Sequence, residues 1–170
     1  MSSEELVKYF NVLVKGLKKA LYEQRGEGSR FRTYLIGRDF FAEKIKGKVR
    51  EDEDWSEILG KVGETVKELG IAKDMSHSLE FVREFDDLVV GRVIHVSVKG
   101  CIHKEIDKEL SERKVPPHTF CPIANMVMYI ADELKNKGEA ASELVMVDMT
   151  DEGCALTICV FESPKGGSNR

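Results

Sequence analysis

Cysteine and histidine residues concentrate between positions 101 and 154, in three separated segments of the chain. Cys101 and His103 are two residues apart, so in an extended chain their side chains lie on one side, roughly 6.5 Å apart. His118 and Cys121 are three residues apart, and Cys154 comes from a later segment. Zinc takes thiolate and imidazole ligands in a tetrahedron, and thiolates also suit iron. These five residues predict a metal or small-ligand site, with zinc as the first candidate and iron as the second.

Cys121 has a second interpretation, because Pro122 follows it and fits the first position of a helix. A thiol at a helix N-terminus is close to unpaired backbone N–H groups and to the positive end of the helix dipole, and both favour thiolate. With His118 or His103 as base, Cys121 would be a nucleophile or a redox thiol. A thiolate is also the better metal ligand, so both hypotheses stay open. For His77 and His95 we expect ordinary surface or half-buried roles.

The first half of the chain predicts amphipathic helices. Ser2 and Glu5 form a capping box at the start of the first one. Its apolar residues recur every three or four positions, so this helix must pack on its own sheet or on a partner helix. The heptad-like spacing favours a homodimer formed through this helix. The helices are expected within residues 2–24, 31–45 and 54–69.

The third of these helices has clear boundaries in the sequence. Asp54 and Glu57 form a second capping box, and Gly70 ends the helix. Gly60 and Gly63 lie inside it, where each costs about 1 kcal/mol relative to alanine. We therefore expect close packing against both glycines.

The second half changes to strands and short helices. Strands are expected over residues 79–85 and 89–99, helices over 102–113 and 121–137, and a hairpin of 144–149 with 154–162. With a turn of residues 150–153, Met149 faces Cys154, and Cys154 points into the protein. Cys159 alternates onto the other face of the hairpin, and we expect it to fill the core. Two further pairs follow from the same turn: Val147 with Leu156, and Val145 with Ile158.

Composition and charge narrow the class of protein. The net charge is -4 and no concentrated basic patch is present, so nucleic-acid binding is not expected. No run approaches the ~20 apolar residues of a membrane span, and the first residues do not resemble a signal peptide. We expect a cytoplasmic protein with reduced cysteines and no membrane insertion. Residues 1–162 are predicted to form a single ligand-binding-type α+β domain, with N-terminal helices packed on a twisted antiparallel sheet, a C-terminal helix and a β-hairpin. Residues 163–170 are predicted to be a disordered tail.

The order of motifs in the second half resembles the 4-vinyl-reductase-type, or hydrocarbon-binding, domain family. The resemblance covers residues 31–162, and it is most specific in Gly100-Cys101, Phe120-Cys121-Pro122 and Gly153-Cys154. That family shares a fold with the haem nitric-oxide-binding domain and with Golgi transport-complex subunits. The resemblance implies a small-molecule-binding module of archaeal or bacterial type, some members of which accompany tetrapyrrole synthesis, with a zinc site near the hairpin. Where members often carry an acidic residue and a cysteine before the turn, this chain has Asp148 and Met149, so Cys101 and Cys121 would supply the missing thiolates.

The leading functional hypothesis is a sensor or carrier for a small, mostly apolar or tetrapyrrole-like ligand held between the sheet and the helices. The metal would be structural or would orient the ligand, and no catalytic step is assigned. One alternative is a thiol-dependent enzyme or reductase that uses Cys121, and another is a dimeric assembly subunit. The apolar residues expected to line the site also suit an ordinary core. They are Phe81, Val96, Met126, Val127, Tyr129, Val147 and Leu156.

Overall fold

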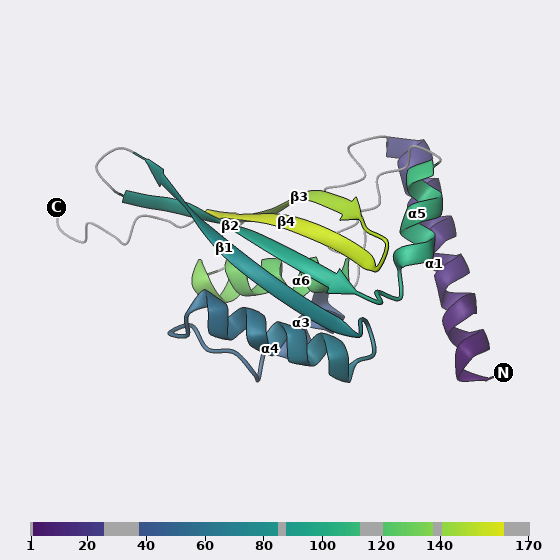
Figure 1. Ribbon diagram of the computed structural model, residues 1–170, viewed down its shortest axis with the longest axis horizontal. Coiled ribbons are helices and arrows are strands. Elements are labelled where there is room, and N and C mark those ends of the chain that lie inside the picture. Colours follow the sequence, from purple (N-terminus) through teal and green to yellow (C-terminus); the bar gives the residue numbers. More distant parts are fainter. Residues whose placement is uncertain (1, 26–37, 85–87, 113–120, 138–140, 162–170) are drawn as a thin grey trace.

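Helices and a four-stranded sheet make up the described part of this computed structural model, which comprises residues 2–25, 38–84, 88–112, 121–137 and 141–161 (Figure 1). The fold is α+β, as the sequence predicts. In chain order the elements are α1 (Ser3–Arg25), α3 (Arg38–Ile45), α4 (Trp55–Glu68), β1 (Asp74–Glu84), β2 (Leu88–Lys99), α5 (Lys104–Glu112), α6 (Pro122–Tyr129), its π-helical continuation η3 (Ile130–Lys135), β3 (Ser142–Met149) and β4 (Gly153–Phe161).

The sheet is antiparallel throughout, with the strand order β1-β2-β4-β3. The two hairpins therefore meet at their second strands, β2 and β4. Figure 1 shows the strands twisting across one another, with α3, α4 and α6 on one face of the sheet. No described helix lies on the opposite face, which we call the open face (Figure 1). None of the helices in the described ranges combines the length and apolar character needed to cross a membrane.

The hydrophobic core lies between the covered face of the sheet and the helices. Ile94, Val96 and Val98 of β2 and the even-numbered residues of β4 point into it, because side chains alternate along a strand. Helices α4 and α6 add their apolar stripes from the other side. The completely buried residues at this interface include Ile58, Leu59, Val62, Ile94, Val96, Ile123, Met126, Val127, Leu156 and Ile158.

The predicted helix boundaries are confirmed where local capping sets them. At the start of α1, the amide of Ser2 donates to Glu5 and the amide of Glu5 donates to Ser2 Oγ. At the start of α4, the amide of Glu57 donates to Asp54 Oδ1 over 2.8 Å, and the amide of Asp54 donates back to Glu57. Gly70 has a φ of 67°, a left-handed conformation that ends α4 without strain.

The two glycines within α4 differ in their surroundings. A Cβ added at Gly63 would lie 3.5 Å from Met75 Cε of β1, so the predicted close packing is found there. A Cβ at Gly60 would have no heavy atom within 4 Å. The prediction is therefore wrong at Gly60, which lies on the solvent side of the helix.

Helix α1 does not lie on the sheet, in contrast to α3 and α4. Figure 1 shows it beside α5, at one end of the sheet. Lys15 Nζ of α1 pairs with Glu109 of α5. The stripe that was expected to be covered remains exposed in this chain, and it comprises Leu6, Phe10, Leu13 and Leu17.

Some predicted boundaries and pairs differ from the structure. Strand β1 begins at Asp74 rather than at residue 79, and the helix expected over 121–137 becomes π-helical from Ile130. The pairs of Met149 with Cys154 and of Val147 with Leu156 are confirmed. The pair of Val145 with Ile158 is wrong, because the register shifts between Leu144 and Met146 and places Leu144 opposite Ile158. Residues 31–37 of the second predicted helix and the predicted tail lie outside the described residues.

Candidate functional site

Cys101 follows β2 at a sharp turn. Gly100 before it has a φ of 62°, and its amide donates to the carbonyl of Glu152 over 2.8 Å. A Cβ at Gly100 would lie 2.7 Å from the Lys73 side chain, so this position needs glycine for conformation and for space. The half-buried Cys101 Sγ accepts a hydrogen bond from the amide of His103 at 3.5 Å. The turn thus fixes Cys101 and His103 next to the β3–β4 hairpin.

Cys121 is the N-cap of α6, as the sequence predicts. Its backbone is extended, with φ -92° and ψ 113°, and its Sγ accepts a hydrogen bond from the amide of Ala124 at 3.5 Å. Pro122 occupies the first turn of the helix. The thiol therefore takes the place of the serine or aspartate that usually caps a helix, and it is half-buried against the main core.

Cys154 is the second residue of β4 and points into the core, as predicted. It is 6% exposed and lies between Val98 of β2 and Met149 of β3 in the sheet register. The pairing of Lys99 with Gly153 brings the end of β2 beside the start of β4. Cys101 and Cys154 therefore belong to the same end of the sheet.

The start of α6 lies toward that same end. Asp132 of η3 accepts a hydrogen bond from Ser142 Oγ over 2.7 Å where β3 begins, at the opposite end of the hairpin from its turn. The helix runs along the strands, so its first residues lie toward the turn (Figure 1). We call the region of Cys101, His103, Cys121 and Cys154 the cysteine end.

A complete metal site is not formed by the described residues alone. Among them, no three histidine, cysteine, aspartate or glutamate side chains lie close enough to hold one metal ion. His118, the fifth predicted ligand, lies outside the described residues. The four cysteines, all of them described, form no disulfide.

Six of the seven residues predicted to line a ligand site do meet at the sheet–helix interface. Val96, Met126, Val127 and Leu156 are at most 1% exposed, and Tyr129 and Val147 pack against them with part of their surface exposed. Phe81 is not among them. It is 54% exposed near the β1–β2 turn, and the Arg92 guanidinium lies 4.8 Å from the centre of its ring.

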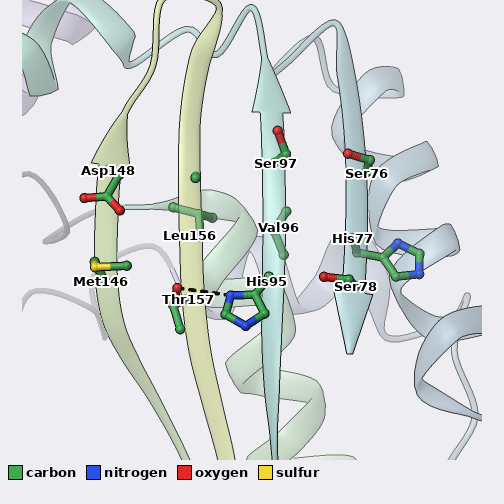
Figure 2. A pocket seen from close by; sticks show the side chains of 11 residues that line it. Ser76, His77, Ser78, His95, Val96, Ser97, Met146, Asp148, Leu156 and Thr157 are labelled. Atoms are coloured by element: carbon green, nitrogen blue, oxygen red, sulfur yellow. Dashed lines mark hydrogen bonds between the residues drawn. The ribbon is translucent and has the colours of Figure 1, made fainter. Parts of the chain in front are cut away.

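The open face carries a hollow of about 480 Å³ that sequence reasoning missed. Two neighbouring rows of side chains, each crossing all four strands, form its floor and sides (Figure 2). Strand pairing places Ser76, Ser97, Ala155 and Asp148 in one row, and Ser78, His95, Thr157 and Met146 in the other. His77, Val96 and Leu156 also border the hollow, although their side chains belong to the covered face.

His95 connects three strands on this face. Its Nδ1 lies 3.4 Å from Thr157 Oγ1 of β4, shown by the dashed line in Figure 2, and its Nε2 lies 3.4 Å from Glu80 Oε1 of β1. The side chain of His77 instead lies on the covered face, where its Nε2 is 3.4 Å from Ser56 Oγ of α4. The sequence indicates this hollow only through short or polar residues at alternate positions, 76 and 78 in one strand and 95 and 97 in the next. That pattern predicts a hollow only when the pairing register is known.

Cys159 is on the open face, opposite Val93 and Glu143 in the register. Its predicted place on the other face of the hairpin is confirmed, but its expected role in the core is wrong, because no described helix covers that face. Burial raises the pKa of this half-exposed thiol above its ordinary value, and the negative charge of Glu143 raises it further.

Comparison of the chain with protein-family models, with curated proteins and with solved structures gives no match.

Proposed function

We propose that this protein binds a small, mostly apolar molecule at the cysteine end, with a metal ion held by thiol and imidazole groups. One observation supports the proposal most: thiols from three elements far apart in the sequence approach one end of the sheet and contact one core. Cys101 and Cys121 are half-buried there, so they border both solvent and the apolar interior. A ligand bound at this end would contact the thiols on one side and apolar core residues on the other.

The donor types at the cysteine end fit zinc best and iron second. Since the described residues supply no group of three donors, the proposed site includes His118, which precedes Cys121 by three positions in the sequence. When bound, the ion would tie the segments together and orient the polar end of the ligand. The resemblance to 4-vinyl-reductase-type domains also favours an apolar or tetrapyrrole-like ligand. Reduced thiols of this kind suit the cytoplasm.

Elemental analysis and native mass spectrometry of freshly purified protein test this proposal. We expect about one zinc or iron ion per chain, and its loss in the Cys121→Ser and Cys101→Ser variants. Cys159→Ser is the matched control, because that thiol lies on the open face and should leave the metal content unchanged. Protein that contains no metal, and takes up none when zinc is added under reducing conditions, would contradict the metal site.

The same Cys121→Ser variant separates this proposal from a thiol-dependent enzyme. If Cys121 is a metal ligand, the variant should melt at a lower temperature, and cysteine alkylation in the wild type should increase after chelation. If Cys121 is only a nucleophile, Cys121→Ser should leave the melting temperature unchanged. Chelation should then have no effect on cysteine alkylation in the wild type.

Self-association through α1 is a second candidate, and a specific feature favours it. Leu13 and Leu17 of the uncovered stripe are 43% and 54% exposed. Lys8 and Lys15, which line the α1–α5 contact, lie on roughly the opposite side of the helix, since an α-helix turns about 100° per residue. The side of α1 that carries the leucines is thus available to the same stripe of a second copy, in a two-fold helix pair.

Light scattering after size exclusion tests the helix pair. The double variant Leu13→Lys with Leu17→Lys should change a dimer into a monomer. Glu23→Lys is the matched control, because it changes the net charge by the same amount on another side of α1 and should leave the dimer intact. A wild-type protein that is monomeric at micromolar concentration would overturn this candidate and leave the ligand-binding proposal unaffected.

A further inference from the structure

The hollow on the open face has a simple origin in the sequence. Outer positions of a sheet usually carry long polar side chains, but here two adjacent rows carry Ser76, Ser78, Ser97 and Ala155. The neighbouring row toward the β1–β2 turn carries Glu80 and Glu143 at its edges. Short side chains between longer ones leave space above the sheet. Its volume of about 480 Å³ is within the ~300–1,000 Å³ typical of sites for small ligands.

Hydrogen-bonding groups line this space. The hydroxyls of Ser76, Ser78, Ser97 and Thr157 can each donate and accept, and His95 adds an imidazole that Glu80 and Thr157 hold in position. Figure 2 shows these side chains distributed over β1, β2 and β4, with Met146 and Asp148 on β3. A polar molecule lying across the strands would meet hydroxyl groups on at least three of them.

The charge on this face is predominantly negative. Asp148 is exposed in the hollow and forms no ion pair within the described part of the chain, and Glu80 and Glu143 lie two rows away from it, beyond the row that contains His95. The cation nearest in register, Lys99, pairs with Glu152 at 2.7 Å. The carboxylates therefore favour a positively charged ligand over an anion.

We propose that this hollow is a second binding site, separate from the cysteine end, for a small organic amine that also carries hydroxyl groups. Its ammonium group would pair with the Asp148 carboxylate, and its hydroxyls would bond with the serine and threonine side chains on the floor. Met146 would cover an apolar part of the ligand. The proposal does not depend on metal binding, because none of its residues belongs to the cysteine end.

Glucosamine and glucose form a matched pair of probes, since they differ by an amine in place of one hydroxyl. In an NMR titration, millimolar glucosamine should shift the backbone amide signals of Ser97, Ala155 and Asp148, and glucose should bind about fivefold more weakly. Asp148→Asn should remove this preference, and Glu64→Gln on the exposed side of α4 should retain it. Equal shifts with both sugars, or no shifts among these residues, would overturn the proposal.

A second variant tests the place of binding independently of charge. Ser97→Phe puts a large ring into the floor of the hollow at an exposed strand position, where an aromatic residue is well tolerated. It should abolish the shifts caused by glucosamine, while the rest of the spectrum should remain that of a folded protein. Undiminished binding by Ser97→Phe would show that the amine binds elsewhere.

Discussion

Arg38 Nη2 of α3 lies 3.1 Å from Asp132 Oδ2 of η3, and the two side chains are only 12% and 4% exposed. The other oxygen of Asp132 accepts hydrogen bonds from the amide of Ala141 and from Ser142 Oγ at the start of β3. One buried carboxylate therefore connects a helix, the π-helical segment and an edge strand. A π-helical turn is uncommon, and here it carries the side chain that makes these three contacts.

Removal of this carboxylate should destabilise the protein strongly. Asp132→Ala leaves the largely buried Arg38 without this partner and removes the hydrogen bonds from Ala141 and Ser142, so the free energy of unfolding should fall by about 3 kcal/mol. Urea unfolding followed by circular dichroism measures the change. Glu133→Gln is the control, because Glu133 also lies 3.5 Å from Arg38 but is 49% exposed, and its loss should cost less than about 1 kcal/mol. Equal losses in the two variants would contradict this account.

Glu53 should make the protein sensitive to acid. Its side chain is 4% exposed, and Lys61 Nζ donates to its Oε1 at 2.6 Å. This hydrogen bond holds the pKa of Glu53 below the ordinary value of 4.5. An acid with a lowered folded-state pKa contributes stability that is complete above its unfolded pKa and is lost as the pH falls through the folded value. Stability should therefore decline below about pH 4.5.

The variant Glu53→Gln tests that decline. It should be less stable than the wild type at neutral pH, and its urea midpoint should change less as the pH falls from 7 to about 3. Glu64→Gln, at an exposed position of α4, should retain the acid sensitivity of the wild type. An acid decline of the same size in Glu53→Gln would show that other carboxylates are responsible.

Features that depend on neighbouring residues could be predicted from the sequence. The capping box of Asp54 with Glu57 and the cap at Cys121 involve groups three residues apart, so the sequence pattern contains all the partners. The hairpin turn could also be predicted, together with the inward direction of Cys154, because alternation from a short turn fixes the first pairs. The bulge near Val145 could not be predicted, since the residue types of the strand do not indicate where the extra residue lies.

Contacts that depend on the pairing of β2 with β1 and β4 were outside the reach of the sequence. The contacts of His95 with Glu80 and Thr157 join residues of three strands, and only the register brings them together. The position of Cys121 relative to Cys101 depends on the direction in which α6 runs along the strands (Figure 1). The sequence predicted that these thiols belong to one site, but the distances between them follow from the packing of the helix.

Two glycine substitutions should have opposite effects on stability. A Cβ at Gly153 would lie 2.0 Å from the backbone oxygen of Val98, so Gly153→Ala must displace β4 from β2 and should cost about 3 kcal/mol. Gly60→Ala introduces no contact within 4 Å and replaces a flexible residue inside a helix, so it should stabilise by about 1 kcal/mol. Thermal unfolding of both variants checks the contrast. A stable Gly153→Ala protein would mean that β2 and β4 are less closely paired at this end.

Cys159 should react slowly with alkylating reagents, because burial and the charge of Glu143 raise its pKa and reduce the fraction of thiolate. Glu143→Gln removes the charge opposite Cys159, lowers the pKa and should speed alkylation about twofold near pH 8. Peptide mass spectrometry after iodoacetamide treatment measures the rate at this cysteine separately from the other three. Glu80→Gln is the control, since Glu80 lies in the same row but two strands away and should have a smaller effect. If both variants speed alkylation equally, the slow reaction of Cys159 reflects the overall charge of the open face rather than its contact with Glu143.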